Sequence, residues 1–128
     1  IQVGFGAWGR DWAAHVRATP EVRVVGVVDA HLEAVRAAGA LYGLPGERSF
    51  TSLAEALAET DAEGVLITAG AAAHAPLALE ALGADKHVLV EKPFALTLAD
   101  AQALVDAAAA RDRVLMVSQN YRFFPAAW

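Results

Sequence analysis

The sequence predicts a single α/β domain built on a doubly wound parallel sheet. Three observations indicate this fold. Short apolar runs alternate along the chain with longer segments of helical pattern, and the connections between them are short. Parallel strands need helical crossovers of this kind, and the helices then cover both faces of the sheet. The length of 128 residues suits one such domain.

The apolar runs define six expected strands. Each run is short and bounded by glycine, proline or polar residues. The second is almost all valine, which is typical of a strand buried on both faces. The expected strands cover residues 1–5, 22–28, 49–50, 64–68, 87–90 and 114–117.

Local signals mark the ends of the helices expected between these strands. Gly43 is a typical C-terminal stop. Ser52 and Glu55 have the spacing of a capping box, and Thr97 with Asp100 forms a shorter version of it. The expected helices cover residues 10–18, 32–42, 53–59, 72–82 and 98–111.

Composition excludes several classes of function. The net charge of −5 argues against a general nucleic-acid binder, and the absence of cysteine excludes disulfides, zinc–thiolate sites and cysteine nucleophiles. No metal site is expected. The longest uncharged stretch, residues 64–79, is shorter than the roughly 20 strongly apolar residues of a membrane span. We expect a soluble, cytoplasmic protein with no membrane partner.

The first chemical signal is a glycine motif after the first strand. Gly4, Gly6 and Gly9 fit G-x-G-x-x-G between a strand and a helix. Gly4 permits the tight turn, Gly6 lets the backbone approach a pyrophosphate, and Gly9 lets helix and strand pack closely. The start of the helix offers N–H groups to the phosphates. The alternative is a plain glycine-rich turn.

Asp29 strengthens the dinucleotide interpretation. It ends the second strand, 20 residues after Gly9, close to the spacing of an acid that binds the adenosine ribose. Its charge repels a 2′-phosphate, and no arginine follows directly, so NAD is expected rather than NADP. Asp29 could also cap the next helix, a role compatible with the first.

The second signal is Glu91-Lys92-Pro93, directly after the fifth strand. Ligands bind at the carboxyl ends of strands in open α/β sheets. A lysine in a partly dry cleft there can relay a proton, and a cis Lys92–Pro93 bond is conceivable. An ordinary exposed Glu–Lys pair explains the residues equally well.

Two further strand ends carry weaker signals. Thr68 and Ala69 begin a loop of small residues after the fourth strand, and His74 follows in the next helix. Asn120 and Arg122 lie in a polar segment after the sixth strand. For the first group, the residues alone favour a plain strand–helix connection over a loop that lines a cofactor. For the second, the alternative is a domain exit with Arg122 in a salt bridge.

Taken together, these motifs resemble the N-terminal domain of the glucose–fructose oxidoreductase/inositol 2-dehydrogenase (Gfo/Idh/MocA) family. The resemblance covers essentially the whole chain, and its most specific stretch is KHVLVEKPFALT at residues 86–97. It implies a Rossmann fold over residues 1–120 and an exit segment at residues 121–128. It also implies an NAD(P)-dependent oxidoreductase that transfers a hydride between nicotinamide and a sugar, polyol or related alcohol.

The resemblance also implies roles for individual residues. Lys92 would be the catalytic residue and, with Arg122, would contact substrate. The family usually has proline where Ala69 stands, and alanine makes the loop less rigid. The cofactor would lie against Gly4, Gly6, Ala7, Trp8, Gly9, Asp29, Thr68, Ala69, His74, Glu91, Lys92 and Asn120.

Family members also carry a second α/β domain, which supplies the substrate pocket, an acid–base partner and usually the oligomer interface. The resemblance therefore implies a homo-oligomer in the full-length protein, and a chain that holds only the cofactor-binding half. The alternative is a stand-alone module that binds a dinucleotide or senses redox state without turnover. Lys92 favours an enzyme. A Rossmann-like methyltransferase is a weaker reading, because Glu-Lys-Pro has no evident use there.

Overall fold

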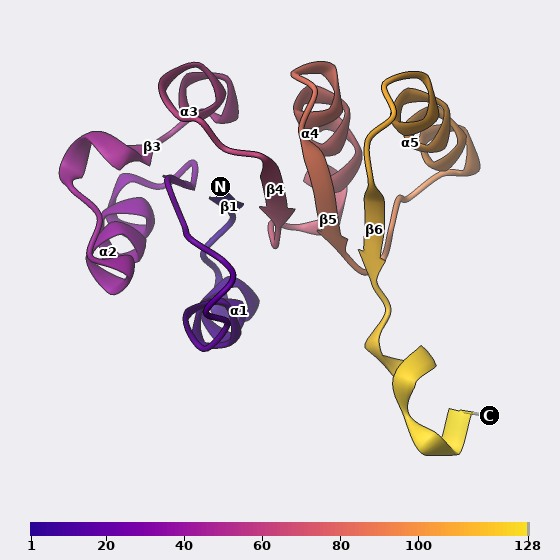
Figure 1. The fold of residues 1–128 in the computed structure, drawn as a ribbon, viewed down its shortest axis with the longest axis horizontal. Helices are drawn as coiled ribbons and strands as arrows, with labels where there is room; N and C mark the ends of the chain where they lie inside the picture. Colours follow the sequence, from indigo (N-terminus) through magenta and orange to yellow (C-terminus); the bar gives the residue numbers. More distant parts are fainter. Residues whose placement is uncertain (128) are drawn as a thin grey trace.

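The computed structural model describes residues 1–127 and confirms the predicted α/β fold. Its six strands form one parallel sheet in the order β3-β2-β1-β4-β5-β6 (Figure 1). The order reverses between β1 and β4, which is where ligands bind in open α/β sheets. The strands are β1 (Gln2–Val3), β2 (Val27–Val28), β3 (Ser49–Phe50), β4 (Gly64–Ile67), β5 (His87–Glu91) and β6 (Leu115–Ser118).

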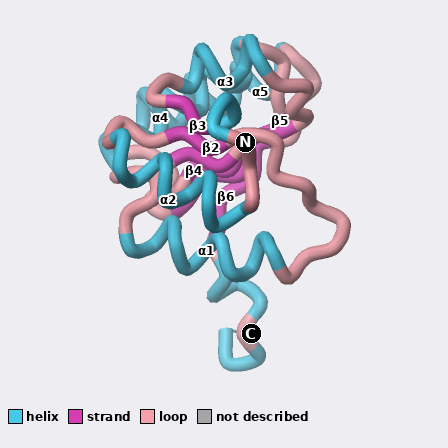
Figure 2. The backbone as a smooth tube through the Cα atoms, turned by 90° about the vertical axis from the view of Figure 1, so that its left-hand side faces the viewer, coloured by secondary structure: helices cyan, strands magenta, loops and turns pink. Residues whose placement is uncertain are grey.

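Helices lie on both sides of the sheet (Figure 2). Two hydrophobic cores follow from this layering. The larger core joins the sheet to the side chains of α3, α4 and α5, and the smaller core joins β2 and the glycine turn to α2. Successive residues of a strand face opposite sides, so Val28 belongs to the larger core and Val27 to the smaller. The helices are α1 (Ala7–Arg17), α2 (Leu32–Tyr42), α3 (Leu53–Glu59), α4 (Ala71–Gly83) and α5 (Leu98–Ala110).

The second strand is shorter than predicted. The sequence predicts residues 22–28, whereas only Val27 and Val28 pair with neighbours, opposite Gln2 and Val3 of β1. The Gly26 carbonyl still accepts a hydrogen bond from the Gln2 N–H at 3.2 Å, but residues 22–26 have no ladder partner in β1 or β3 of the described sheet. Val22 is accordingly 51 % exposed rather than buried.

The predicted helix ends are mostly confirmed. Gly43 ends α2 with φ of 66°, the left-handed conformation that glycine adopts without strain. The Thr97 hydroxyl accepts a hydrogen bond from the Asp100 N–H at 3.0 Å at the start of α5. The capping box at Ser52 is wrong: the residue precedes α3, but its side chain makes no capping hydrogen bond.

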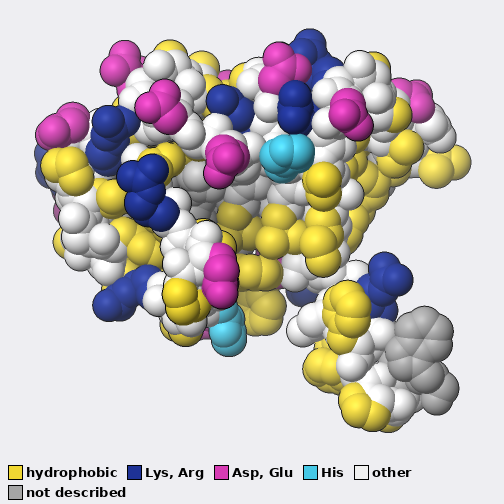
Figure 3. All heavy atoms as spheres, viewed as in Figure 1, with side chains coloured by type: hydrophobic (Ala, Val, Ile, Leu, Met, Phe, Trp, Pro, Cys, Tyr) yellow, Lys and Arg dark blue, Asp and Glu magenta, His cyan; other side chains and the backbone are white. Residues whose placement is uncertain are grey.

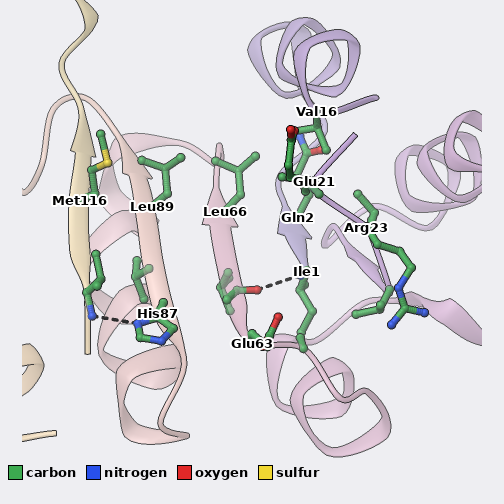
Figure 4. A pocket seen from close by; sticks show the side chains of 18 of the residues that line it. Ile1, Gln2, Val16, Glu21, Arg23, Glu63, Leu66, His87, Leu89 and Met116 are labelled. Atoms are coloured by element: carbon green, nitrogen blue, oxygen red, sulfur yellow. Dashed lines mark hydrogen bonds between the residues drawn. The ribbon is translucent and has the colours of Figure 1, made fainter. Parts of the chain in front are cut away.

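One half of the sheet is open on the side away from α3, α4 and α5. Leu66, Leu89 and Met116 are neighbours across β4, β5 and β6 and point the same way (Figure 4). Hydrophobic side chains gather over these strands in the space-filling view (Figure 3). A cavity of about 570 Å³ lies on this face, away from the strand ends that carry the motifs.

The segment after β6 contains two short 3-10 helices, Asn120–Phe123 and Pro125–Ala127, and extends away from the sheet (Figure 1). Within residues 1–127, no helix combines the length and the apolar character required to cross a membrane.

Candidate cofactor and active site

The glycine turn lies at the point where the strand order reverses. Gly4 has φ of +89°, a conformation that side chains other than glycine rarely adopt. A Cβ atom there would also lie 2.5 Å from the backbone N of Ala69. The turn after β1 and the loop after β4 are thus in direct contact, and only glycine fits between them.

The other two glycines differ in their surroundings. A Cβ on Gly9 would lie 2.0 Å from the Gly4 carbonyl oxygen, so Gly9 is required for α1 to pack against the turn. A Cβ on Gly6 would meet no atom within 4 Å, and Gly6 is the exposed residue directly before α1. The free space above Gly6 and the unpaired N–H groups at the start of α1 fit a pyrophosphate.

Asp29 connects the end of β2 to the glycine turn. Its Oδ2 accepts a hydrogen bond from the Phe5 N–H at 2.7 Å, and its Oδ1 accepts one from the His31 N–H at 2.9 Å. Burial alone would raise the pKa of Asp29, but these N–H donors outweigh it and hold the pKa below its usual value. An ionised carboxylate therefore lies beside the turn. It is not the cap of α2, a position that His31 occupies.

The predicted catalytic lysine lies near the same turn. Lys92 follows β5, is exposed, and forms a cis peptide bond with Pro93. Its Nζ lies 5.2 Å from the centre of the Trp8 ring, within the range of a cation–π contact. Trp8 is in the first turn of α1, so the ammonium group lies close to the predicted phosphate site.

Glu91 is buried beneath Lys92 and is held by several donors. It is 4 % exposed; its Oε1 accepts a hydrogen bond from the Trp12 indole N–H at 2.8 Å and its Oε2 one from the Lys92 N–H at 3.0 Å. Burial raises the pKa of Glu91, but donors that include the side chains of Trp12, Trp8 and Ser118 lower it by more. Glu91 thereby fixes the backbone from which Lys92 projects.

His74 is buried and connects two loops of the site, the loop after β4 and the loop after β5. It is 1 % exposed, with Nδ1 at 2.7 Å from the Pro93 carbonyl oxygen and Nε2 at 2.9 Å from the Ala69 carbonyl oxygen. Both ring nitrogens therefore face backbone carbonyls. The Thr68 hydroxyl is also buried, and it donates to the Gly4 carbonyl at 2.7 Å. These two side chains support the loop, whereas Ala69 is partly exposed.

Asn120 and Arg122 are placed differently. Both are exposed and follow β6, the edge strand, in the segment that extends away from the sheet. Arg122 lies 5.4 Å from the centre of the Phe123 ring. The structure does not bring these two residues to the glycine turn. Among residues 1–127 there is also no group of His, Asp or Glu side chains arranged to hold a metal ion.

Three residues near the site were not predicted from the sequence. Trp12 donates a hydrogen bond to Glu91, while Gln2 and Tyr42 make hydrogen bonds under the glycine turn. Trp12 carries a signal in its spacing, since it lies four residues after Trp8 and thus on the same side of α1. Gln2 carries one too, as a polar residue within an otherwise apolar strand.

Comparison with known proteins agrees with this geometry. The chain belongs to the Gfo/Idh/MocA oxidoreductase family, which has an NAD-binding Rossmann fold and matches residues 2–119. The family resemblance predicted from the motifs is therefore confirmed, and so is NAD binding as the property of this domain.

Individual relatives are moderately similar. D-apiose dehydrogenase of Paraburkholderia graminis is 36% identical over 124 residues, which are 97% of this chain and 32% of that enzyme. Inositol 2-dehydrogenase of Salmonella typhimurium is 36% identical over 82% of this chain and 31% of its own length. The crystal structure of the WlbA dehydrogenase from Bordetella pertussis, in complex with NADH and UDP-GlcNAcA, matches with a TM-score of 0.89 at 28% identity, over 95% of this chain and 35% of that one. The chain spans about a third of the length of the curated relatives it matches.

Proposed function

We propose that this chain is the cofactor-binding part of an NAD-dependent oxidoreductase that acts on a hydroxyl group of a sugar, polyol or related alcohol. The observation that carries the proposal is the position of Lys92. Its ammonium group lies against Trp8 at the start of α1, beside the open space over Gly6. One edge of the sheet thus presents both a pyrophosphate site and a group able to exchange a proton.

Each part of the site has a defined task in this proposal. The N–H groups at the start of α1 bind the pyrophosphate, and Asp29 accepts hydrogen bonds from the adenosine ribose. NAD, when bound, supplies hydride acceptance or donation. Lys92 exchanges a proton with the substrate hydroxyl, while Glu91 and His74 hold the turn on either side of it. Residues 1–120 form this cofactor-binding part and residues 121–127 lead out of it; residue 128, the last of the predicted exit segment, lies outside the described residues.

The charge of Asp29 supports NAD over NADP. The carboxylate is kept ionised by the N–H groups of Phe5 and His31, so it would repel a 2′-phosphate. Calorimetric titration of the chain with each dinucleotide tests this point. We expect NAD to bind more tightly. Tighter binding of NADP would contradict the assignment of Asp29, and binding of neither would contradict the proposed cofactor site.

The role of Lys92 has a matched control at the other end of the same strand. The sequence contains two lysines, and Lys86 lies just before the opposite end of β5. In the full-length protein, Lys92→Ala should lower NAD-dependent turnover of a sugar or polyol by about a hundredfold or more, the scale of a lost acid–base group. NAD affinity should change little, and Lys86→Ala should leave turnover intact. Equal turnover in the two variants would reject the role of Lys92, and a full-length protein that binds NAD but turns over no alcohol would favour a binding module.

A further inference from the structure

A buried polar network lies directly beneath the glycine turn. Its central member is Gln2, in the middle of the sheet, which is 1 % exposed. An amide in such a position is costly unless its polar atoms are paired. The structure pairs them with groups from α1, α2 and the end of β4, so Gln2 connects three parts of the site that are far apart in the sequence.

Each hydrogen bond of the network pairs a donor with a suitable acceptor. The Gln2 Nε2 donates to the Gly9 carbonyl at 2.8 Å and to the Thr68 hydroxyl at 3.3 Å. The Thr68 hydroxyl in turn donates to the Gly4 carbonyl at 2.7 Å. The Tyr42 hydroxyl donates to the Gln2 Oε1. Every donor thus has an acceptor, which is the condition for a buried network to stabilise one arrangement.

The network determines the orientation of peptide groups in the turn. Peptide groups are planar, so holding a carbonyl also orients the N–H of the next residue. Holding the Gly4 carbonyl orients the Phe5 N–H, which donates to Asp29. Holding the Gly9 carbonyl orients the Arg10 N–H, which donates to the Gly6 carbonyl at 3.1 Å. The groups that shape the phosphate site are therefore fixed from underneath.

We propose that Gln2 and Tyr42 are positioning residues for the dinucleotide phosphates, an inference that rests on the proposed function. Tyr42 reaches the turn from the last turn of α2 and also packs edge-on against the Phe5 ring, with ring centres 6.3 Å apart. Burial raises the pKa of Tyr42 to about 12, a rise that nearby Arg17 partly opposes, so the hydroxyl stays a donor at neutral pH. Neither residue touches the exposed space over Gly6, and both act through the backbone.

The test uses variants that keep the approximate shape of the side chain and remove its hydrogen bonds. Gln2→Met has a similar length but no amide, so the Gly9 carbonyl loses its buried donor. The turn then spends less time in the binding-competent arrangement, and the apparent Kd for NAD should rise by about tenfold. Leu104→Val, a core change in α5, is the control because α5 packs on α4 and β6. It should lower the free energy of unfolding without changing the Kd.

Tyr42→Phe is the second variant and serves if Gln2→Met does not fold. It should raise the Kd by a smaller factor, and the double variant should bind NAD no worse than Gln2→Met alone, since both changes break one network. Amide hydrogen exchange of residues 5–9 without NAD gives an independent readout. We expect faster exchange there in both network variants and unchanged exchange in Leu104→Val.

The outcomes separate the two proposals. A wild-type chain that does not bind NAD would overturn the proposed function. The network is tested separately: unchanged amide exchange of residues 5–9 in both network variants would overturn it, whether or not NAD binds. A wild-type chain that binds NAD together with an unchanged Kd in Gln2→Met would overturn only the positioning role. A rise in Kd that also appears in Leu104→Val would show that lost stability, not positioning, is responsible.

Discussion

Two alanine substitutions in the glycine turn should have opposite effects on stability and binding. Gly6→Ala and Gly9→Ala add the same methyl group three residues apart. At Gly9 the new Cβ would lie 2.0 Å from the Gly4 carbonyl oxygen and 3.0 Å from the Thr68 hydroxyl oxygen. At Gly6 it would meet nothing within 4 Å. The pair therefore separates the packing role of the turn from its ligand-binding role.

The magnitudes follow from these distances. Because Cβ atoms do not approach other heavy atoms within 3.0 Å, Gly9→Ala must move α1 away from the turn by about 1 Å. The Gly4 carbonyl belongs to the backbone and cannot rotate aside as a flexible side chain can. We therefore expect the free energy of unfolding to fall by about 3 kcal/mol, in the upper part of the usual overpacking range. That is a large share of a typical total of about 5–15 kcal/mol.

Gly6→Ala should leave the fold intact. Gly6 has φ of −61° and ψ of −170°, which alanine adopts without strain. The free energy of unfolding should stay unchanged or rise by about 0.4–1 kcal/mol, because the unfolded chain loses freedom. The methyl group would occupy the space proposed for the pyrophosphate. The Kd for NAD should therefore rise by about tenfold or more, equivalent to about 1.4 kcal/mol.

Urea unfolding followed by circular dichroism measures the first quantity, and calorimetric titration with NAD measures the second. Equal stability of the two variants would refute the packing argument. Wild-type affinity in Gly6→Ala would refute the placement of the pyrophosphate over Gly6, whatever the stability shows.

Three further predictions concern the titrating groups near the site. Asp29→Asn removes the charge beside the turn, so NAD should bind about tenfold more weakly while NADP loses less, measured by paired titrations. The pKa of Glu91 in the folded chain lies below its usual 4.5, so the stabilisation by its ionised form is present above pH 4.5 and lost as pH falls through the folded pKa. The stability gap between wild type and Glu91→Gln should therefore shrink in acid urea titrations; a constant gap would contradict it. The pKa of Tyr42 is raised from 10.0 to about 12, so stability should decline as pH rises through this interval, and Tyr42→Phe should lack that decline.

The motifs predicted the edge of the sheet at which the candidate site is proposed, because they rest on local physics. Glycine spacing between a strand and a helix, an acid at the end of the second strand and a lysine after the fifth each follow from short-range geometry. Parallel strands then bring their carboxyl ends to one edge, so the sequence alone predicts that Gly6, Asp29 and Lys92 lie at the same edge. The roles of individual side chains were harder to predict, because they depend on which side chains the fold buries and which groups they contact.

Residue patterns alone were enough for the fold class, the order of helices and strands and the position of the glycine turn. Apolar spacing and glycine act through the local chain and need no distant partner. The tertiary structure decided which side chains support that chemistry. Trp12 donates to Glu91 across 79 residues of sequence, and Tyr42 reaches Gln2 across 40. His74 was predicted at the cofactor, and only the fold shows that its two ring nitrogens face backbone carbonyls. Such contacts depend on how helices pack on the sheet, and packing is a property of the whole domain rather than of any local pattern.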